Sequence, residues 1–132
     1  MNVLFVVAAG LVSYNMPQGS SRGSAASAYK FYDWNYDGNW LPNNQLVNGL
    51  GCLADAAYGP DNFKLSYYAA NRGWVGWKKS PERPYVEILF EFDAPREFHS
   101  VSVFANNQFT RDVAVFSEAR AAFSMVRPVP IT

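Results

Sequence analysis

Hydrophobic and polar residues alternate most regularly between residues 85 and 92. The apolar side chains of this segment all fall on one face of an extended chain: Val86, Ile88, Phe90 and Phe92. Glu87 and Glu91 fall on the opposite face, which gives the period of two that is typical of a strand. The pattern therefore predicts a β-strand with one buried side and one solvated side.

Two segments further along the chain have a similar character. In residues 100–105, three small or β-branched side chains share one face: Val101, Val103 and Ala105. Residues 112–116 (DVAVF) are a third candidate strand. The connection at residues 93–97 contains Pro95, which cannot donate a hydrogen bond to a continuing ladder. The C-terminal half is therefore expected to be a series of short strands.

Turn residues divide the rest of the chain. Residues 18–27 form a run of small side chains that predicts a loop, and three short motifs predict turns at residues 36–38, 48–49 and 58–60. Residues 116–123 have the composition of a helix, but their periodicity does not decide the matter. No segment has the length, spacing and caps of an amphipathic helix. The fold class predicted is all-β, with the loops and isolated aromatics of a jelly roll or β-sandwich.

Residues 3–9, near the start of the chain, are apolar and allow two interpretations. Val3 to Ala9 resemble the hydrophobic core of a secretory signal, but no basic residue precedes them and the run is short for a signal. It is also far shorter than the about 20 residues that span a bilayer. The alternative is a buried strand or an arbitrary start to the chain, so residues 1–9 are set apart from residues 10–132.

Composition supports a folded chain and excludes several functions. The 132 residues are 49% hydrophobic and 17% aromatic, with 11 basic and 11 acidic side chains. This balance argues against nucleic acid as a partner, because phosphate binding needs a basic surplus. Cys52 and His99 are the only cysteine and histidine, so neither a disulfide nor a Cys/His zinc cluster can form within the chain. Cys52 and His99 could formally make a nucleophile pair, but no local motif supports one. A chain without a disulfide is ordinarily cytosolic.

Three groups of residues are candidates for chemistry. Asp and Asn side chains are concentrated between residues 33 and 62, and calcium prefers such oxygen ligands, although turns use the same residues. Exposed tryptophans would suit a free-standing carbohydrate-binding jelly roll, and the candidates are Trp40, Trp74 and Trp77. Glu87 and Glu91 could be a glycosidase pair, but on an amphipathic strand they are better explained as its solvated side.

Seven motifs in a fixed order resemble those of a known family. They are the segments at residues 10–14, 36–38, 49–55, 61–63, 74–77, 85–93 and 103–107 (GLVSY, YDG, GLGCLAD, DNF, WVGW, YVEILFEFD and VFANN). Together they resemble the discoidin domain receptors, the collagen-activated receptor tyrosine kinases. Within those receptors they resemble the second extracellular module, the discoidin-like domain that lies between the discoidin domain and the membrane. Segments 49–55 and 85–93 are the most specific of the seven.

The resemblance implies an extracellular, non-catalytic jelly-roll barrel, here incomplete at its C-terminus, on the outer face of the plasma membrane. Its implied partner is the adjacent discoidin domain of the same receptor, with collagen contacted only indirectly and the membrane reached only through a transmembrane helix outside this chain. The family's structural calcium site would fall on side-chain or backbone oxygens at Tyr32, Asp33, Asp55, Ala57, Arg72 and Trp74. Cys52 stands where the family has an amide ligand, and a thiol is a poor ligand for this hard cation.

Overall fold

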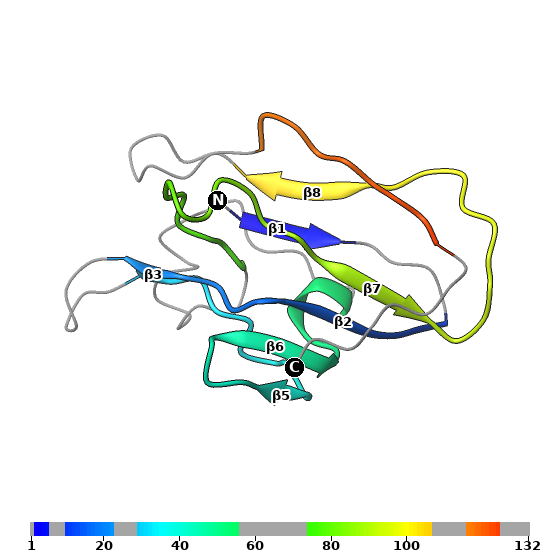
Figure 1. The fold of residues 1–132 in the computed structure, drawn as a ribbon, viewed down its shortest axis with the longest axis horizontal. Coiled ribbons are helices and arrows are strands. Elements are labelled where there is room, and N and C mark those ends of the chain that lie inside the picture. Colours follow the sequence, from blue (N-terminus) through cyan, green and yellow to red (C-terminus); the bar gives the residue numbers. More distant parts are fainter. Residues whose placement is uncertain (1, 6–9, 23–28, 56–73, 107–115, 125–132) are drawn as a thin grey trace.

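A computed structural model describes residues 2–5, 10–22, 29–55, 74–106 and 116–124 of the chain (Figure 1). Its strands are β1 (Asn2–Phe5), β2 (Leu11–Pro17), β3 (Ser21–Arg22), β4 (Tyr29–Lys30), β5 (Asn39–Trp40), β6 (Gln45–Gly49), β7 (Leu89–Phe92) and β8 (Val103–Asn106). One turn of 3-10 helix, η1 (Cys52–Ala54), is the only helical element in these ranges. The predicted all-β class is therefore confirmed. No helix within the same ranges is long and apolar enough to cross a membrane.

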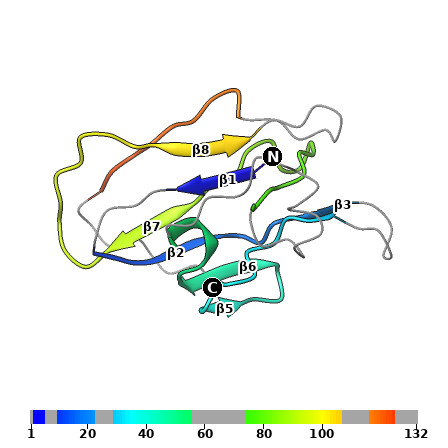
Figure 2. The ribbon, with the colours of Figure 1, turned by 180° about the vertical axis from the view of Figure 1, so that it is seen from behind.

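Antiparallel pairing joins the described strands into three sheets. The largest has the order β5-β6-β2-β7, while β1 pairs with β8 and β3 pairs with β4. None of these sheets closes on itself. The η1 turn lies beside β2 and β6 in both ribbon views (Figures 1 and 2) and also contacts β1. It therefore connects the main sheet to the β1–β8 pair.

The central strand, β2, is one that the sequence pattern did not predict. Tyr14 and Met16 project from it into the core and are fully buried, while Val12 is half exposed. Ser13 is buried as well, although simple alternation would place it opposite Tyr14. The reason is that the register of β2 shifts twice, once against β7 and once against β6. Such β-bulges re-aim side chains and obscure the period of two.

The residues predicted to form a turn at positions 48–49 lie at the second of these bulges instead. Those residues lie within β6, and the prediction of a chain reversal there was wrong. Asn48 has a φ of 62°, in the left-handed region that Asn tolerates, and occupies the extra position of the bulge. The chain reverses earlier, between β5 and β6, where Asn44 also has a positive φ, of 66°. The turn chemistry of Asn is thus present at both places, but only one of them is a hairpin.

The core lies between β2, β6, η1 and the segment before β7. Its buried members are Tyr14, Met16, Leu46, Cys52, Leu53, Val75 and Trp77. Val86, Ile88 and Phe90 pack against this cluster and Glu87 is exposed, as the alternation of residues 85–92 predicted. The two faces are not distinct within β7, whose four residues are all half-buried, Glu91 included. The strand itself is shorter than predicted and covers only β7.

The C-terminal predictions have mixed outcomes. A strand does form in the second predicted segment, but it is shifted to Val103–Asn106 and pairs with β1. Its predicted apolar face is not buried, since Val101 and Val103 are exposed. Residues 116–124 are irregular, so the helix suggested by their composition is absent. Most of the candidate strand at residues 112–116 and the whole predicted turn at residues 58–60 lie outside the described residues.

Candidate functional site

The loop between β4 and β5 carries a buried carboxylate that joins three parts of the chain. Asp33 is only 3% exposed. The Tyr14 hydroxyl, from β2, donates a hydrogen bond to Asp33 Oδ2. The backbone N–H of Cys52, in η1, donates to Asp33 Oδ1 at a distance of 2.9 Å. A buried carboxylate is stable only when such donors replace water. Asp33 therefore connects the central strand, the loop and the 3-10 turn.

A second buried polar side chain holds the backbone of the same loop. Gln18, 2% exposed, accepts hydrogen bonds at Oε1 from the backbone N–H of Asp33 (2.7 Å) and of Gly19 (2.8 Å). Gly51 is the close neighbour on the other side, because a Cβ added there would lie 2.3 Å from Asp33 Oδ1. The carboxylate fits only because residue 51 has no side chain. We call Tyr14, Gln18, Asp33, Gly51 and Cys52 the Asp33 cluster.

A tyrosine beside this cluster makes a parallel connection. The Tyr36 hydroxyl donates to the Tyr14 carbonyl (2.5 Å) and accepts from the backbone N–H of Gly49 (2.8 Å). The rings of Tyr36 and Tyr14 are tilted against each other with centroids 5.3 Å apart. The loop is therefore tied to both β2 and β6 by tyrosine hydroxyls.

The electrostatics of the cluster keep its weak acids protonated. Burial, and after it the negative charge of Asp33, raises the pKa of the Cys52 thiol to about 12 and shifts the pKa of Tyr14 far above its ordinary value. Burial also raises the pKa of Tyr36 to about 12. A protonated, buried thiol is a poor nucleophile. The chemistry of this cluster is therefore that of a structural network of hydrogen bonds.

The positions implied for calcium are only partly brought together. Asp33 and Cys52 are in contact, and Asp55 lies near enough for its charge to contribute to the raised pKa of the thiol. Asp55 itself is exposed and accepts a hydrogen bond from the Asn35 amide at 3.4 Å. Ala57 and Arg72 lie outside the described residues.

At the remaining two calcium positions, Tyr32 and Trp74, the side chains make aromatic or core contacts, which leaves their backbone oxygens as the predicted ligands. The Tyr32 ring packs against Trp34 and Trp40, and Trp74 is buried with 3% of its surface exposed. Within the described ranges, no three His, Cys, Asp or Glu side chains are grouped as metal ligands. Both oxygens of Asp33 already accept hydrogen bonds from protein donors. Calcium takes about six to eight oxygen ligands, which can include backbone carbonyls, and two of the six positions lie outside the described residues. The calcium site therefore stays a prediction.

The other candidates from the sequence are separated by the fold. Cys52 is buried in the core whereas His99 is exposed on the connection between β7 and β8, so they do not form a nucleophile pair. Trp74 and Trp77 are both buried, and the Trp77 indole donates to the Pro17 carbonyl at 2.8 Å. Neither offers a face for sugar stacking. Trp40 is 53% exposed and remains available.

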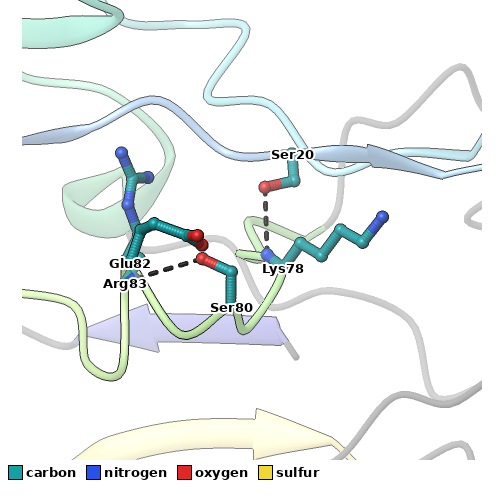
Figure 3. A pocket seen from close by; sticks show the side chains of 5 residues that line it. All are labelled: Ser20, Lys78, Ser80, Glu82 and Arg83. Atoms are coloured by element: carbon teal, nitrogen blue, oxygen red, sulfur yellow. Dashed lines mark hydrogen bonds between the residues drawn. The ribbon is translucent and has the colours of Figure 1, made fainter.

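A polar pocket of about 330 Å³ lies apart from all of these residues. It is lined by Ser20, Lys78, Ser80, Glu82 and Arg83. Both serine hydroxyls accept backbone hydrogen bonds, from Lys78 N–H (3.0 Å) and from Arg83 N–H (3.1 Å). Figure 3 shows that the charged ends of Lys78 and Arg83 point in different directions, while Glu82 lies beside Ser80. The charges do not converge on one ligand position.

Sequence reasoning did not find most members of the Asp33 cluster. Asp33 stood out as an acidic residue in an oxygen-rich stretch, which suggested metal binding rather than a hydrogen-bond acceptor. Tyr14 and Gln18 lie 19 and 15 positions away from it along the chain, and no local spacing links them. The closely spaced glycines at 49 and 51 are the one local signal, because they allow close approach of other groups.

Comparison with known proteins identifies the family. The chain matches the family model described as "Discoidin domain-containing receptor 1/2, DS-like domain" over residues 10–129. The chain belongs to this family. The resemblance drawn from its seven motifs is thereby confirmed.

Several receptors are similar to this DS-like domain. The chain is 30% identical over 115 residues to "Discoidin domain-containing receptor tyrosine kinase B" of Caenorhabditis elegans, which covers 87% of this chain and 13% of the relative. It is 38% identical over 107 residues to "Epithelial discoidin domain-containing receptor 1" of Homo sapiens, covering 76% of this chain and 11% of the relative. The chain thus spans only a small part of the curated relatives that it matches. No solved structure matches it.

Proposed function

We propose that the chain is a non-catalytic extracellular module of a collagen receptor tyrosine kinase. The observation that carries the proposal is the family match over residues 10–129, which covers the whole Asp33 cluster and the main sheet. The names of the relatives describe receptor tyrosine kinases, and this chain corresponds to one domain of them. The kinase activity belongs to another part of such a receptor.

The proposed role of the module is to support the adjacent discoidin domain, which makes the collagen contact. The hydrogen bonds of Asp33, Gln18 and Tyr36 favour this role, because they tie the loop before β5 to two neighbouring strands. A buried network that is fully satisfied rigidifies the segments it joins. A rigid unit can hold a neighbouring domain at a fixed position relative to the membrane.

Sequencing the transcript on both sides of this region tests the domain arrangement. We expect an open reading frame with a discoidin domain upstream and a transmembrane segment and kinase domain downstream. A reading frame that joins this module to domains of another kind would contradict the proposed receptor. The same transcript also provides the protein needed for the next experiment.

Antibody labelling of intact cells tests the proposed location. An antibody raised against this module is expected to label cells that express the protein without permeabilisation, because the module lies outside the plasma membrane. An antibody against a cytosolic protein should label the same cells only after permeabilisation. If the module also needs permeabilisation, the extracellular location is wrong.

Calcium, which the family resemblance implies, is proposed not to hold the Asp33 loop together. Hydrogen bonds from Tyr14 and Cys52 already hold the Asp33 carboxylate, so the loop has a fixed anchor without an ion. We expect the same melting temperature in Ca²⁺ and in chelator. An ion at a hundredfold excess over its Kd would add about 2.7 kcal/mol and raise the Tm by roughly 10 °C. A rise of that size, lost in Asp55→Asn, would establish a calcium site instead.

A further inference from the structure

Three neighbouring aromatic side chains lie in the segment between β4 and β6: Trp34 and Trp40 are exposed, and Tyr32, which contacts both, is half-buried. The Tyr32 ring lies 5.2 Å from the Trp34 ring and 6.0 Å from the Trp40 ring, measured between centroids. Trp34 is 46% exposed and Trp40 is 53% exposed. We call these three residues the aromatic patch. Adjacent tryptophans that remain half exposed mark a surface with a binding role more often than scattered single residues do.

The Trp40 indole is held in place before any ligand arrives. Its Nε1–H donates to Asn44 Oδ1 at 2.8 Å, and its ring meets Tyr32 edge-on. Asn44 is itself fixed by the hairpin turn, since its backbone N–H donates to the Leu41 carbonyl at 2.9 Å. An exposed ring that is already ordered loses little entropy on binding. Trp40 therefore presents a preorganised flat face.

The segment that carries the patch is polar and contributes no positive charge of its own. Residues 31–55 contain no Lys or Arg, whereas exposed amides are frequent and include Asn39, Asn43 and Asn44. Asn43 and Asn44 use their oxygens within the turn, which leaves their NH₂ groups to donate outward. Phosphate or sulfate groups would find no cation within this segment. A neutral ligand with many hydroxyl groups matches the available amides.

Two other ligands of aromatic surfaces fit less well. A proline-rich peptide docks in an aromatic-lined groove, where an indole N–H is a natural donor to its backbone carbonyls, but the Trp40 N–H is already used by Asn44. A quaternary ammonium needs rings that surround it. Here the rings of Trp34 and Trp40 touch Tyr32, which leaves outer faces instead of a cage. We propose that the aromatic patch binds a neutral oligosaccharide: pyranose rings stack on Trp40 and Trp34, and the NH₂ groups of Asn43 and Asn44 donate hydrogen bonds to the sugar hydroxyls. This activity is independent of the proposed support of a discoidin domain.

A glycan array tests the proposal with the whole chain as the probe. The array holds neutral and acidic oligosaccharides, with a proline-rich peptide and a trimethyl-lysine peptide as further spots. We expect binding to at least one neutral oligosaccharide, with an affinity that falls tenfold or more in Trp40→Ala. Lys79→Ala, a substitution of an exposed residue that is not a member of the patch, should bind as the unchanged chain does.

Three further controls keep the result interpretable. Trp40→Phe should retain part of the affinity because it keeps a flat ring. Asn44→Gly tolerates the positive φ but frees the indole, so it should weaken binding several-fold. Circular dichroism verifies that each variant is folded. The proposal is overturned if no neutral oligosaccharide binds above the level of Trp40→Ala, or if only the acidic glycans or one of the two peptides binds.

Discussion

Replacing Asp33 by alanine is expected to lower the free energy of unfolding by about 3–5 kcal/mol. The substitution removes the acceptor of the Tyr14 hydroxyl and of the Cys52 backbone N–H, and both donors are buried. A buried donor without a partner costs its full desolvation energy. Chemical denaturation followed by tryptophan fluorescence measures the loss, because Trp74 and Trp77 are buried in the native chain.

A matched surface substitution and a double-mutant cycle make this measurement specific. Asp93→Ala removes an exposed carboxylate that pairs with Arg96 at 2.9 Å, and it should cost less than about 1 kcal/mol. Tyr14→Phe removes the hydroxyl donor alone and should cost about 1–3 kcal/mol. The double variant Tyr14→Phe/Asp33→Ala should lose less than the sum, because both changes remove the same hydrogen bond. Equal losses in Asp33→Ala and Asp93→Ala, or simple additivity in the cycle, would contradict the central role of Asp33.

The predictability of each strand from the sequence depends on how regular its alternation is. The apolar face of residues 85–92 was predicted because four side chains follow the period of two without interruption. In β2 the alternation covers only residues 12–16 (VSYNM), and in the structure two bulges and the buried Ser13 interrupt the matching alternation of burial. A bulge depends on the partner strand, which the local pattern does not contain.

The tryptophans illustrate the same limit in the binding candidates. Trp74 and Trp77 fall on opposite sides of an extended segment, which made one exposed face plausible. In the structure Gly76, between them, donates to the Phe31 carbonyl and accepts from the Ser20 N–H, so the segment packs against residues 20 and 31, and both tryptophans are buried. Gly19 at this crossing lies so close that an added Cβ would be 1.7 Å from the Phe31 oxygen. Contacts between segments this far apart in sequence cannot be obtained from spacing alone.

Family motifs supplied what periodicity could not, and physical contacts then corrected the residue roles. The seven motifs were sufficient to predict the family, since their order is specific even where each is weak. The role of Asp33 did not follow from them. It depends on Tyr14, on the absence of a side chain at Gly51 and on the backbone of Cys52, all of which are brought together only in the folded chain.

Stability is expected to fall steeply as the pH rises above about 9. The pKa of Cys52 is raised from 9.0 to about 12, mainly by burial, and the pKa values of Tyr14 and Tyr36 are raised from 10.0, also mainly by burial. In the unfolded chain these groups lose their protons at their ordinary pKa values, while in the folded chain they keep them. The unfolded state therefore binds fewer protons, and the free energy of unfolding decreases with pH.

The contribution of Cys52 to this decrease can be isolated with a variant. Its stabilisation is fully present below pH 9 and is lost between pH 9 and pH 12, at about 1.4 kcal/mol for each pH unit. Cys52→Ala removes that contribution, so denaturation curves between pH 8 and pH 11 should have a shallower dependence on pH than the unchanged chain. Tyr36→Phe should reduce the slope only above about pH 10, where the free phenol begins to ionise. A slope that is unaltered in Cys52→Ala would mean that the thiol ionises as readily in the folded chain as in the unfolded one. That result would contradict the burial of the Cys52 thiol beside Asp33, because a solvated thiol loses its proton at the ordinary pKa.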